Sequence, residues 1–506
     1  DDDREGEAIA WHICKTFNLP ITSTKRIIFH EITKSAIKAA IKNPTRINMN
    51  TVNAQLARQV LDLLVGFTIS PILWKHISRN TEGSLSAGRC QTPALRLVYE
   101  QQKLINESPG RKVYDTTGVF TKKDLKFVLN YNYDDEDKMA EFLEESLNWE
   151  HKYSVSKPRV TKKNPPIPFT TSTLQQKASN EFNFSPKQTM RLAQTLYENG
   201  YITYMRTDST KYSKEFVDTA KKYIKKEYGD DYINKNVVKL INNESNDKKK
   251  KNKVKNAQEA HEAIRPTKID VTTLNVAGKI TAREVKLYTL IWRNTVESCM
   301  SQAKYYSITS KITAPQEHIY KYSSEQVIFP GWKVVGGYEK ENKEYKYLLK
   351  IKPDTVLDYK EIYSKITLKD LKKNYTEAKL VQMLEKKGIG RPSTFSNLIS
   401  KIQDRGYVKK QNVEGKKIKC VDFRLIGEEL DEIETERVFG NEKNKLVIQP
   451  TGIMVYEFLE KHFDALFNYD YTKNMEDDLD KISKGERVWH TLCDECNTQI
   501  KESTKE

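Results

Sequence analysis

The sequence predicts a multidomain α+β protein. Its 506 residues suffice for roughly three domains and a sizeable core. Apolar residues recur with a helical spacing in the segments 48–110 and 172–300. Short alternating runs with few helix signals fill about 113–160 and return near 303–330. These two kinds of pattern predict separate helical and β-rich units.

An acidic run, DDDREGEAIAWHI, opens the chain, and Asp1, Asp3 and Glu5 alternate in it. Because alternation is the period of a strand, we expect the three carboxylates to share one face at a strand end. An acidic, disordered terminus is the alternative. The apolar pattern that follows predicts a helix from about Glu7 to Phe17, and KRIIFHEITKSAIKAAI predicts a strand and then a helix.

A long amphipathic helix is predicted for TVNAQLARQVLDLLVGFTISPILW, with Asp62 near its middle and Pro71 closing it. SLSAGRCQTPALRLVYEQQ follows as a glycine-containing loop that leads into another helix. Ser86, Arg89 and Gln91 in this segment could donate hydrogen bonds to phosphates. The alternative is an ordinary N-terminal helix cap.

The remainder of the chain is predicted to be mostly helical. A lysine-rich run, Lys248 to Lys251 with Lys253 and Lys255, interrupts the helical pattern of the middle segment, and we interpret it as a solvated loop. After about residue 330 we expect helices, apart from a hairpin around Tyr407–Phe423.

The most informative segment is YITYMRTDST, residues 201–210, in which Tyr204 lies two residues before Arg206. A phenol oxygen can attack a phosphate. A guanidinium can hold that phosphate by two parallel hydrogen bonds and stabilise its developing charge. The segment therefore indicates transfer of a phosphate to tyrosine, and a half-buried tyrosine in a β-rich run is the structural alternative.

A cation is expected beside the acidic run. Carboxylates gathered as closely as Asp1, Asp3 and Glu5 repel one another unless a cation neutralises them, and Mg²⁺ is the usual cation beside a reacting phosphate. No GxxxxGK[ST] phosphate loop occurs in the sequence, so we expect no nucleotide-driven step.

The composition favours an anionic partner. The formal net charge is +16 and the pI is about 9.1, with Lys and Arg spread along the whole chain. No uninterrupted apolar run approaches the roughly 18 residues of a membrane span, and no signal peptide precedes the acidic start. We therefore expect no membrane association and no secretion.

The six cysteines do not suggest a disulfide framework, because four of them are isolated. Cys493 and Cys496 form a single CxxC with His490 just upstream. A structural zinc site needs four ligands, so Zn²⁺ is expected there only if the chain continues with further ligands. An exposed helical pair is the alternative.

Six segments in one order resemble the type IA DNA topoisomerases, specifically the bacterial topoisomerase I branch. They are DxDREGEAIAWH, SAGRCQTPALRL, PFTTSTLQQKA, ITYMRTDST, QEAHEAIRPT and EKKGIGRPSTFSNLISKIQDRGYV. The likeness extends from Asp1 to about Trp489. In the resembled family, further Toprim residues precede the acidic motif and supply a glutamate and a lysine to the site, so we expect the sequence to be a fragment.

The resemblance implies a toroidal core built from a partial Toprim α/β domain, helical domains and a β-rich arch. It divides the chain into the C-terminal part of Toprim (1–47), a helical DNA-binding domain in two parts (48–110 and 331–506), an arch in two parts (111–171 and 303–330) and a helical domain that carries the tyrosine (172–302).

The resemblance also assigns roles to residues. Tyr204 is the nucleophile, Arg206 holds the phosphate, His261 supports the site with Arg265 anchoring its loop, and Glu5 is catalytic as well as a metal ligand. The residues expected to bind DNA are Phe29, His30, Thr33, Arg58, Asp62, Ser86, Arg89, Gln91, Thr203, Asp208 and Arg405.

The implied reaction cleaves single-stranded DNA through a 5′-phosphotyrosine, passes a strand and religates, which relaxes negatively supercoiled DNA without ATP. The implied partners are single-stranded and negatively supercoiled DNA. We expect a monomer in the cytoplasm, the nucleoid or a viral or organellar DNA compartment. A topoisomerase III-like decatenase and a cleavage-deficient single-stranded DNA-binding fragment remain the alternatives.

One helix departs from the family pattern. Gln59, Leu63 and Phe67 stand where the bacterial branch usually has Arg, Arg and Tyr, which shape a pocket that prefers cytosine upstream of the cleavage point. Because two guanidinium groups are lost, we expect this preference to be weakened or altered.

Overall fold

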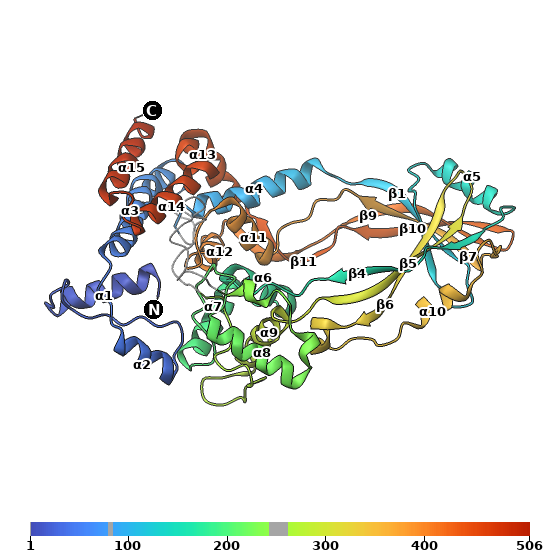
Figure 1. Cartoon of the computed structure of the whole chain (residues 1–506). Coiled ribbons are helices and arrows are strands. Elements are labelled where there is room, and N and C mark those ends of the chain that lie inside the picture. The colour runs from blue at the N-terminus through green and yellow to red at the C-terminus, as the bar shows by residue number, and fades with distance from the viewer. Residues whose placement is uncertain (1, 79–83, 242–261, 506) are drawn as a thin grey trace.

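The computed structural model describes residues 2–78, 84–241 and 262–505. Two helical bodies are joined at one end by a curved sheet, and a small N-terminal part lies beside them (Figure 1). Strands leave both bodies as two arms and meet in the sheet, while helix α6 (Thr171–Phe182) of one body packs on α11 (Glu377–Lys387) of the other. The elements therefore run round a ring, and the predicted α+β class is confirmed.

The first helical body is built around α3 (Met49–His76). Its fully buried face, which includes Leu61, Ile69 and Leu73, packs in a core shared with α14 and α15. The other helices of this body are α4 (Gln91–Glu107), α11, α12 (Phe395–Asp404), α13 (Pro450–Phe467), α14 (Tyr469–Ser483) and α15 (Trp489–Ser503). A two-stranded ladder of β8 (Val408–Val413) and β11 (Glu442–Ile448) packs against them.

Helix α3 meets the length and hydropathy of a membrane span, which the search for uninterrupted apolar runs missed. The same properties belong to core helices of water-soluble proteins, and one such helix is weak evidence for a membrane. In this chain α3 packs on α1, α14 and α15 and carries Arg58 and Asp62 near its middle.

The second helical body carries the tyrosine motif and confirms the helical prediction for 172–300. It comprises α6, α7 (Pro186–Glu198), α8 (Lys214–Glu227) and α9 (Ala282–Ser298), with short 3₁₀ turns η1 (Asp230–Tyr232), η2 (Val237–Leu240) and η3 (Gly331–Gly336). Capping boxes at Thr170 and Thr281 begin α6 and α9, because each side chain accepts a hydrogen bond from the first turn. The lysine-rich run predicted to be a loop lies outside the described residues.

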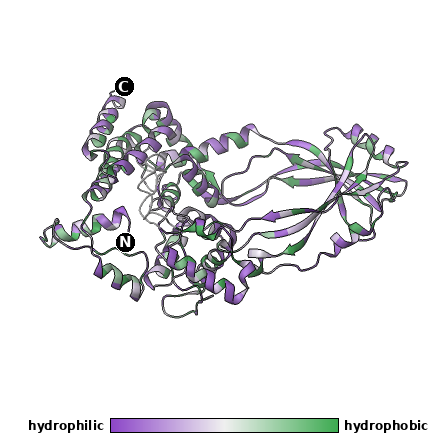
Figure 2. Ribbon diagram, in the orientation of Figure 1, coloured by the Kyte–Doolittle hydropathy of each residue, from purple (hydrophilic) through white to green (hydrophobic). Residues whose placement is uncertain are grey.

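Nine strands of the described chain form one antiparallel sheet in the order β10-β9-β7-β1-β2-β6-β5-β3, with β4 also paired to β5. They are β1 (Arg111–Val119), β2 (Lys126–Leu129), β3 (Tyr153–Val155), β4 (Arg159–Lys163), β5 (Ala303–Thr313), β6 (Ile319–Phe329), β7 (Glu361–Lys369), β9 (Lys416–Ile426) and β10 (Glu429–Phe439). Hydrophobic and hydrophilic residues alternate in bands along the long strands (Figure 2). The sheet predicted at 113–160 and 303–330 is confirmed, although α5 (Glu136–Ser146) interrupts the first segment.

After residue 330 the predicted helices are present as α11 to α15, but the prediction that only a hairpin interrupts them is wrong. Besides α10 (Lys343–Lys350), this part contributes β7, β9 and β10 to the large sheet and β8 and β11 to the small ladder. The predicted hairpin around Tyr407–Phe423 is also wrong: the two strands of this segment, β8 and β9, do not pair with each other. Instead β8 pairs with β11, and β9 pairs with β10 and β7.

Two predictions near the N-terminus are also wrong. Helix α1 (Arg4–Thr16) begins with Asp3 as its N-cap, so Glu5 lies in a helical turn and not on a strand face. The strand expected before α2 (Lys34–Lys42) is reduced to a single antiparallel bridge between Arg26 and Thr45. Within the described residues this segment pairs with no strand, so it does not extend beyond the bridge.

Pro71 does not close α3, which continues through it to His76. An interior proline costs about 3 kcal/mol through the lost hydrogen bond and the ring clash. Ile69 and Leu73 on either side are fully buried, and this packing outweighs the local cost.

Candidate active site and nucleic-acid groove

The tyrosine motif lies in the loop between α7 and α8. Gly200 opens it with a φ of +76°, and a Cβ there would lie 2.6 Å from the Ile32 carbonyl oxygen, so glycine is required. The Tyr204 amide donates to the His30 carbonyl at 2.7 Å, and the Thr203 amide donates to the Arg265 carbonyl at 2.9 Å. The loop is therefore held between two distant segments of the chain.

The Tyr204 side chain is buried, with 2% of its surface exposed. Its hydroxyl donates to Asp3 Oδ2 at 2.5 Å, and its ring meets that of Tyr197 edge to face. Burial and the negative charge of Asp3 both raise the pKa of Tyr204 well above its usual value of about 10. The phenol is therefore neutral, and its proton already points at a carboxylate.

Arg206 joins Asp3, the N-cap of α1, to Glu5 in the first turn of that helix. Its Nη1 donates to Asp3 Oδ2 at 3.2 Å and to Glu5 Oε2 at 2.6 Å. Burial opposes the charged form, but Tyr204, Glu5 and Asp3 together raise the pKa of Arg206. The guanidinium is thus fixed beside the phenol, where it can meet a phosphate.

The acidic motif is held by helix geometry. Asp3 Oδ1 accepts from the Gly6 amide at 2.7 Å, which leaves Oδ2 for Tyr204 and Arg206. Glu5 Oε1 accepts from Arg58 Nη1 at 3.4 Å, and Asp2 lies 3.1 Å from His30 Nδ1. Two of the three predicted metal ligands are thereby brought together, while Asp1, like His261, lies outside the described residues.

The described ranges contain no group of three His, Cys, Asp or Glu side chains arranged to hold a metal. Asp3 and Glu5 nevertheless converge on one cation, the Arg206 guanidinium. Carboxylate oxygens are the ligands that Mg²⁺ prefers, so this pair fits part of a Mg²⁺ site.

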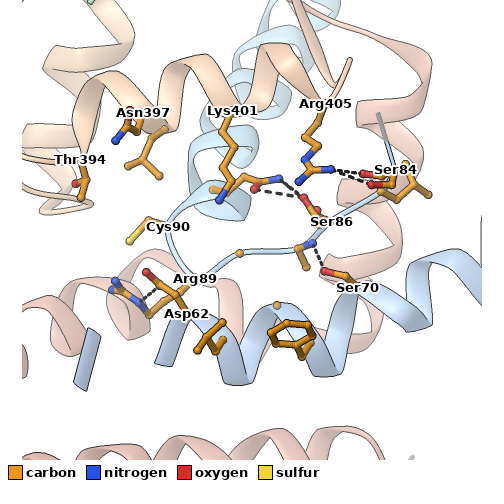
Figure 3. A pocket seen from close by; sticks show the side chains of 18 of the residues that line it. Asp62, Ser70, Ser84, Ser86, Arg89, Cys90, Thr394, Asn397, Lys401 and Arg405 are labelled. Carbon is orange, nitrogen blue, oxygen red and sulfur yellow. Dashed lines mark hydrogen bonds and ion pairs between the residues drawn. The ribbon is translucent and has the colours of Figure 1, made fainter. Parts of the chain in front are cut away.

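A cavity of about 440 Å³ lies between α3 and α12. Figure 3 shows Asn397, Lys401 and Arg405 on one wall and Asp62 on the opposite wall, with the loop of Ser84 and Ser86 between them. Six of the residues predicted to bind DNA line this cavity: Arg58, Asp62, Ser86, Arg89, Gln91 and Arg405. Arg58 and Thr394 also line a small second cleft, together with Asp3 and Glu5 of the tyrosine site.

Local hydrogen bonds fix the walls of this groove. Arg405 Nη1 donates to the Ser84 carbonyl and hydroxyl at 2.8 and 3.0 Å, and Gln91 Nε2 donates to the Ser86 carbonyl at 3.2 Å. Helix α4 begins at Gln91 after Cys90, which makes no side-chain cap. Ser86 and Arg89 are therefore wall residues, and the alternative of a simple helix cap does not describe them.

The other predicted DNA-binding residues lie elsewhere. The Thr203 hydroxyl is buried and donates to the Ala263 carbonyl at 3.0 Å, so it faces the protein interior. Thr33 caps α2. Phe29 and His30 belong to the segment whose backbone holds Tyr204, and Asp208 follows in the tyrosine loop. None of these five lines the cavity between α3 and α12.

Sequence reasoning missed Asn397 and Lys401. Together with Arg405 they repeat every four residues, so they form a polar row on one face of α12. This spacing was the available signal. Two acidic residues of α14, Glu476 and Asp480, were not predicted from the sequence either. Both are buried in ion pairs with arginines from three other segments.

Arg265 anchors the loop predicted for it. Its guanidinium donates from Nη2 to Glu262 Oε2 at 3.1 Å and lies over the Phe216 ring at 4.2 Å. Arg265 also lowers the pKa of Glu262 against the effect of burial.

The expectation of an exposed cysteine pair near the end is wrong. Cys493 and Cys496 lie on α15, and both are buried in the core against α3. Burial raises the pKa of Cys493 to about 11. Apolar packing accounts for both thiols, and no three candidate zinc ligands are grouped around them in the described parts of the chain.

Comparisons with known proteins agree with this arrangement. A family model described as DNA topoisomerase matches residues 46–423. DNA topoisomerase 1 of Vibrio cholerae is 38% identical over 510 residues, covering 98% of this chain and 52% of the relative. DNA topoisomerase 1 of Escherichia coli is 36% identical over 505 residues, covering 98% of this chain and 53% of the relative.

The structure of full-length topoisomerase I from Thermotoga maritima superposes with a TM-score of 0.77 at 30% identity, covering 99% of this chain and 77% of that chain. The chain spans about half the length of the first two relatives. The predicted resemblance is confirmed, and the chain belongs to the DNA topoisomerases, in the type IA, bacterial topoisomerase I branch.

Proposed function

We propose that this chain cleaves single-stranded DNA through Tyr204, passes a strand through the break and religates it, thereby relaxing negatively supercoiled DNA without ATP. The observation that carries the proposal is the contact of the Tyr204 hydroxyl with Asp3, beside an Arg206 guanidinium that also binds Glu5. A nucleophile, a proton acceptor and a phosphate-binding cation are thus within hydrogen-bond reach of one another.

In this proposal Tyr204 attacks a backbone phosphate and its proton passes to Asp3. The P–O3′ bond breaks as the new P–O bond forms, and the leaving 3′-oxygen takes a proton from water to become the 3′-hydroxyl. Arg206 stabilises the charge on the phosphate. The phosphotyrosine bond conserves the energy of the broken diester, so the 3′-hydroxyl can return and religate the strand. His261 supports the site by resemblance.

Mg²⁺ is the proposed cofactor, held by Asp3 and Glu5 together with Asp1. When bound, it would supply positive charge that opposes the repulsion between these carboxylates and the phosphate. Asp3 and Glu5 keep their own roles without it, since both orient Arg206.

The proposed DNA path is the groove between α3 and α12. Lys401 and Arg405 on one wall supply positive charge, and Phe67, with 77% of its surface exposed, supplies an aromatic face on the other. Unpaired bases stack on such rings and phosphates are drawn to such cations, so the groove fits a single strand. Arg58, Ser86, Gln91 and the residues 29–33 would flank that strand.

The proposed base preference differs from that of the family. Leu63 and Phe67 line the groove where the branch has Arg and Tyr, and Gln59 is exposed beside them. An apolar surface stacks on any base but cannot make bidentate contacts to one. Mapping cleavage in a mixed oligonucleotide pool should show a weakened or altered cytosine preference upstream of the break, and the usual strong cytosine signal would refute this.

The covalent step is tested with a labelled single-stranded oligonucleotide and a denaturing gel. The wild type should retain label on the protein, Tyr204→Phe should retain none, and Tyr201→Phe in the same loop should behave as the wild type. Label on Tyr204→Phe, or none on the wild type, would contradict cleavage and favour a DNA-binding fragment. Stronger decatenation than relaxation would favour the topoisomerase III-like alternative.

We further propose that the protein acts as a monomer in a DNA-containing compartment such as the cytoplasm or nucleoid. In this scheme residues 1–47 form part of a Toprim domain. Ile9 and Ile13 of α1 and Phe17 at its C-cap expose apolar side chains on this part.

A further inference from the structure

Eight charged side chains form a circuit of alternating sign that joins the tyrosine site to the groove. In order round the circuit they are Arg4, Asp480, Arg391, Glu476, Arg89, Asp62, Arg58 and Glu5, which returns to Arg4 as its neighbour in the chain. Four guanidinium groups balance four carboxylates. They come from α1, α3, α14 and the loops before α4 and α12.

Helix α14 supplies the buried half of this circuit. Glu476 and Asp480 lie one turn apart, and each side chain is only 4% exposed. Glu476 Oε1 accepts from Arg89 Nη1 at 2.5 Å, and Asp480 Oδ2 accepts from Arg391 Nη2 at 2.9 Å. Since a buried charge is tolerated only with its partners in place, these contacts fix one another.

Arg4 connects α14 to the acidic motif. It lies between Asp3 and Glu5 at the start of α1, and its guanidinium donates to Asp480 Oδ1. Its neighbours Asp3 and Glu5 contact Tyr204 and Arg206. Because Arg4 lies between Asp3 and Glu5 in the chain, a contact that fixes Arg4 also restricts the positions of these two carboxylates.

We propose that Asp480 is a positioning residue for strand cleavage, which holds the first turn of α1 through Arg4 and so aligns Asp3 and Glu5 with Tyr204. The inference rests on the proposed function. Asp480 does not line the groove between α3 and α12, so it is expected to affect the chemical step and not the binding of the strand.

The test compares Asp480→Asn with Asp478→Asn. Asp478 lies on the same helix and pairs with Lys481 and Arg487, outside the circuit, so it is a matched loss of one paired carboxylate. Single-turnover formation of the covalent adduct should slow on the order of 10-fold to 100-fold in Asp480→Asn and stay within about twofold in Asp478→Asn. The Kd of the same oligonucleotide, measured in a Tyr204→Phe background, should change by less than about twofold in both.

Asp480→Glu and Arg4→Gln complete the test. Asp480→Glu keeps the charge but displaces the carboxylate, so its rate should fall between those of the wild type and Asp480→Asn. Arg4→Gln should slow the step as Asp480→Asn does, with no further loss in the double variant. If Asp480→Asn does not fold, a slowed Asp480→Glu with unchanged Kd supports the proposal.

Unchanged rates in Asp480→Asn, or in Asp480→Glu where Asp480→Asn does not fold, would overturn it. So would a parallel loss of rate and binding. If the wild type itself forms no adduct, the proposed function has failed instead.

Discussion

At the scale of the residue, the site depends on charges that stabilise each other. Arg206 Nη1 donates to both Asp3, which accepts from the Tyr204 hydroxyl, and Glu5. A preorganised donor of this kind acts on charge that develops on a phosphate in the transition state.

Arg206→Gln should therefore slow adduct formation on the order of 100-fold to 1,000-fold, the loss seen when one such donor is removed. Single-turnover kinetics on a labelled oligonucleotide measure it. Arg283→Gln on the exposed surface of α9 is the control and should keep the wild-type rate. Equal rates for both variants would mean that Arg206 does not contact the reacting phosphate.

The buried carboxylate of Glu476 makes the stability of the folded protein depend on pH. Burial would raise its pKa, but Arg89 and Arg391 lower the pKa of Glu476 to about 2. Since the folded-state pKa is depressed, the stabilisation is complete above the unfolded value of about 4.3 and is lost as the pH falls toward 2. The shift corresponds to about 3 kcal/mol, within the range for breaking a buried pair.

Glu476→Gln should accordingly lower the Tm at pH 7, where the wild-type carboxylate is fully ionised. The difference in Tm between the two proteins should shrink as the pH is lowered from 5 to 3. Thermal denaturation followed by circular dichroism at several pH values checks this. A difference that does not depend on pH would show that the ionised form of Glu476 contributes no stability.

At the scale of the element, the tyrosine loop depends on its backbone contacts. Gly200→Ala would place a Cβ 2.6 Å from the Ile32 carbonyl oxygen, whereas Gly229→Ala meets nothing within 4 Å. Both positions have positive φ, so both substitutions carry a conformational cost of about 1–2 kcal/mol. Only Gly200→Ala should also slow adduct formation, because it moves the loop away from the segment that holds Tyr204. Equal adduct rates would contradict this.

The elements that the sequence predicted are those with strong local patterns. Helix α3 and the helices of the tyrosine body show regular apolar spacing and clear caps. Strand β10 was missed because ELDEIETERVF lies at the edge of the sheet and buries none of its residues, so it shows no apolar alternation. The start of α1 was misread because Asp3 serves as a cap, which the strand-like spacing of acids concealed.

The candidate site was predictable only in part. Tyr204 and Arg206 are neighbours in the sequence, but the contact of Tyr204 with Asp3 spans 201 residues and depends on the fold. Before the structure, only the resemblance to the type IA topoisomerases linked the tyrosine motif to the acidic run. Glu476 and Asp480 stand among other acidic residues in YDYTKNMEDDLDKIS and drew no prediction, because only the packing of α14 on α3 reveals their arginine partners.

At the scale of the whole molecule, the proposed strand passage would require the ring to open. The two bodies meet where α6 packs on α11, and Lys410 Nζ donates to Asn183 Oδ1 at 3.2 Å across the same junction. The six cysteines are buried, so cysteines introduced at these two exposed or half-buried positions should react selectively with a short bismaleimide.

Cross-linked Asn183→Cys/Lys410→Cys should lose relaxation of a negatively supercoiled plasmid and keep cleavage of an oligonucleotide. The same double variant without the reagent should keep both activities. Relaxation by the cross-linked protein would show that the ring does not open at this junction.

The most direct measurement is mass spectrometry of the covalent adduct after nuclease and protease digestion. We predict a nucleotide attached through its 5′-phosphate to the peptide that carries Tyr204, with the released strand ending in a 3′-hydroxyl. A nucleotide on any other residue, or a link through a 3′-phosphate, would contradict it.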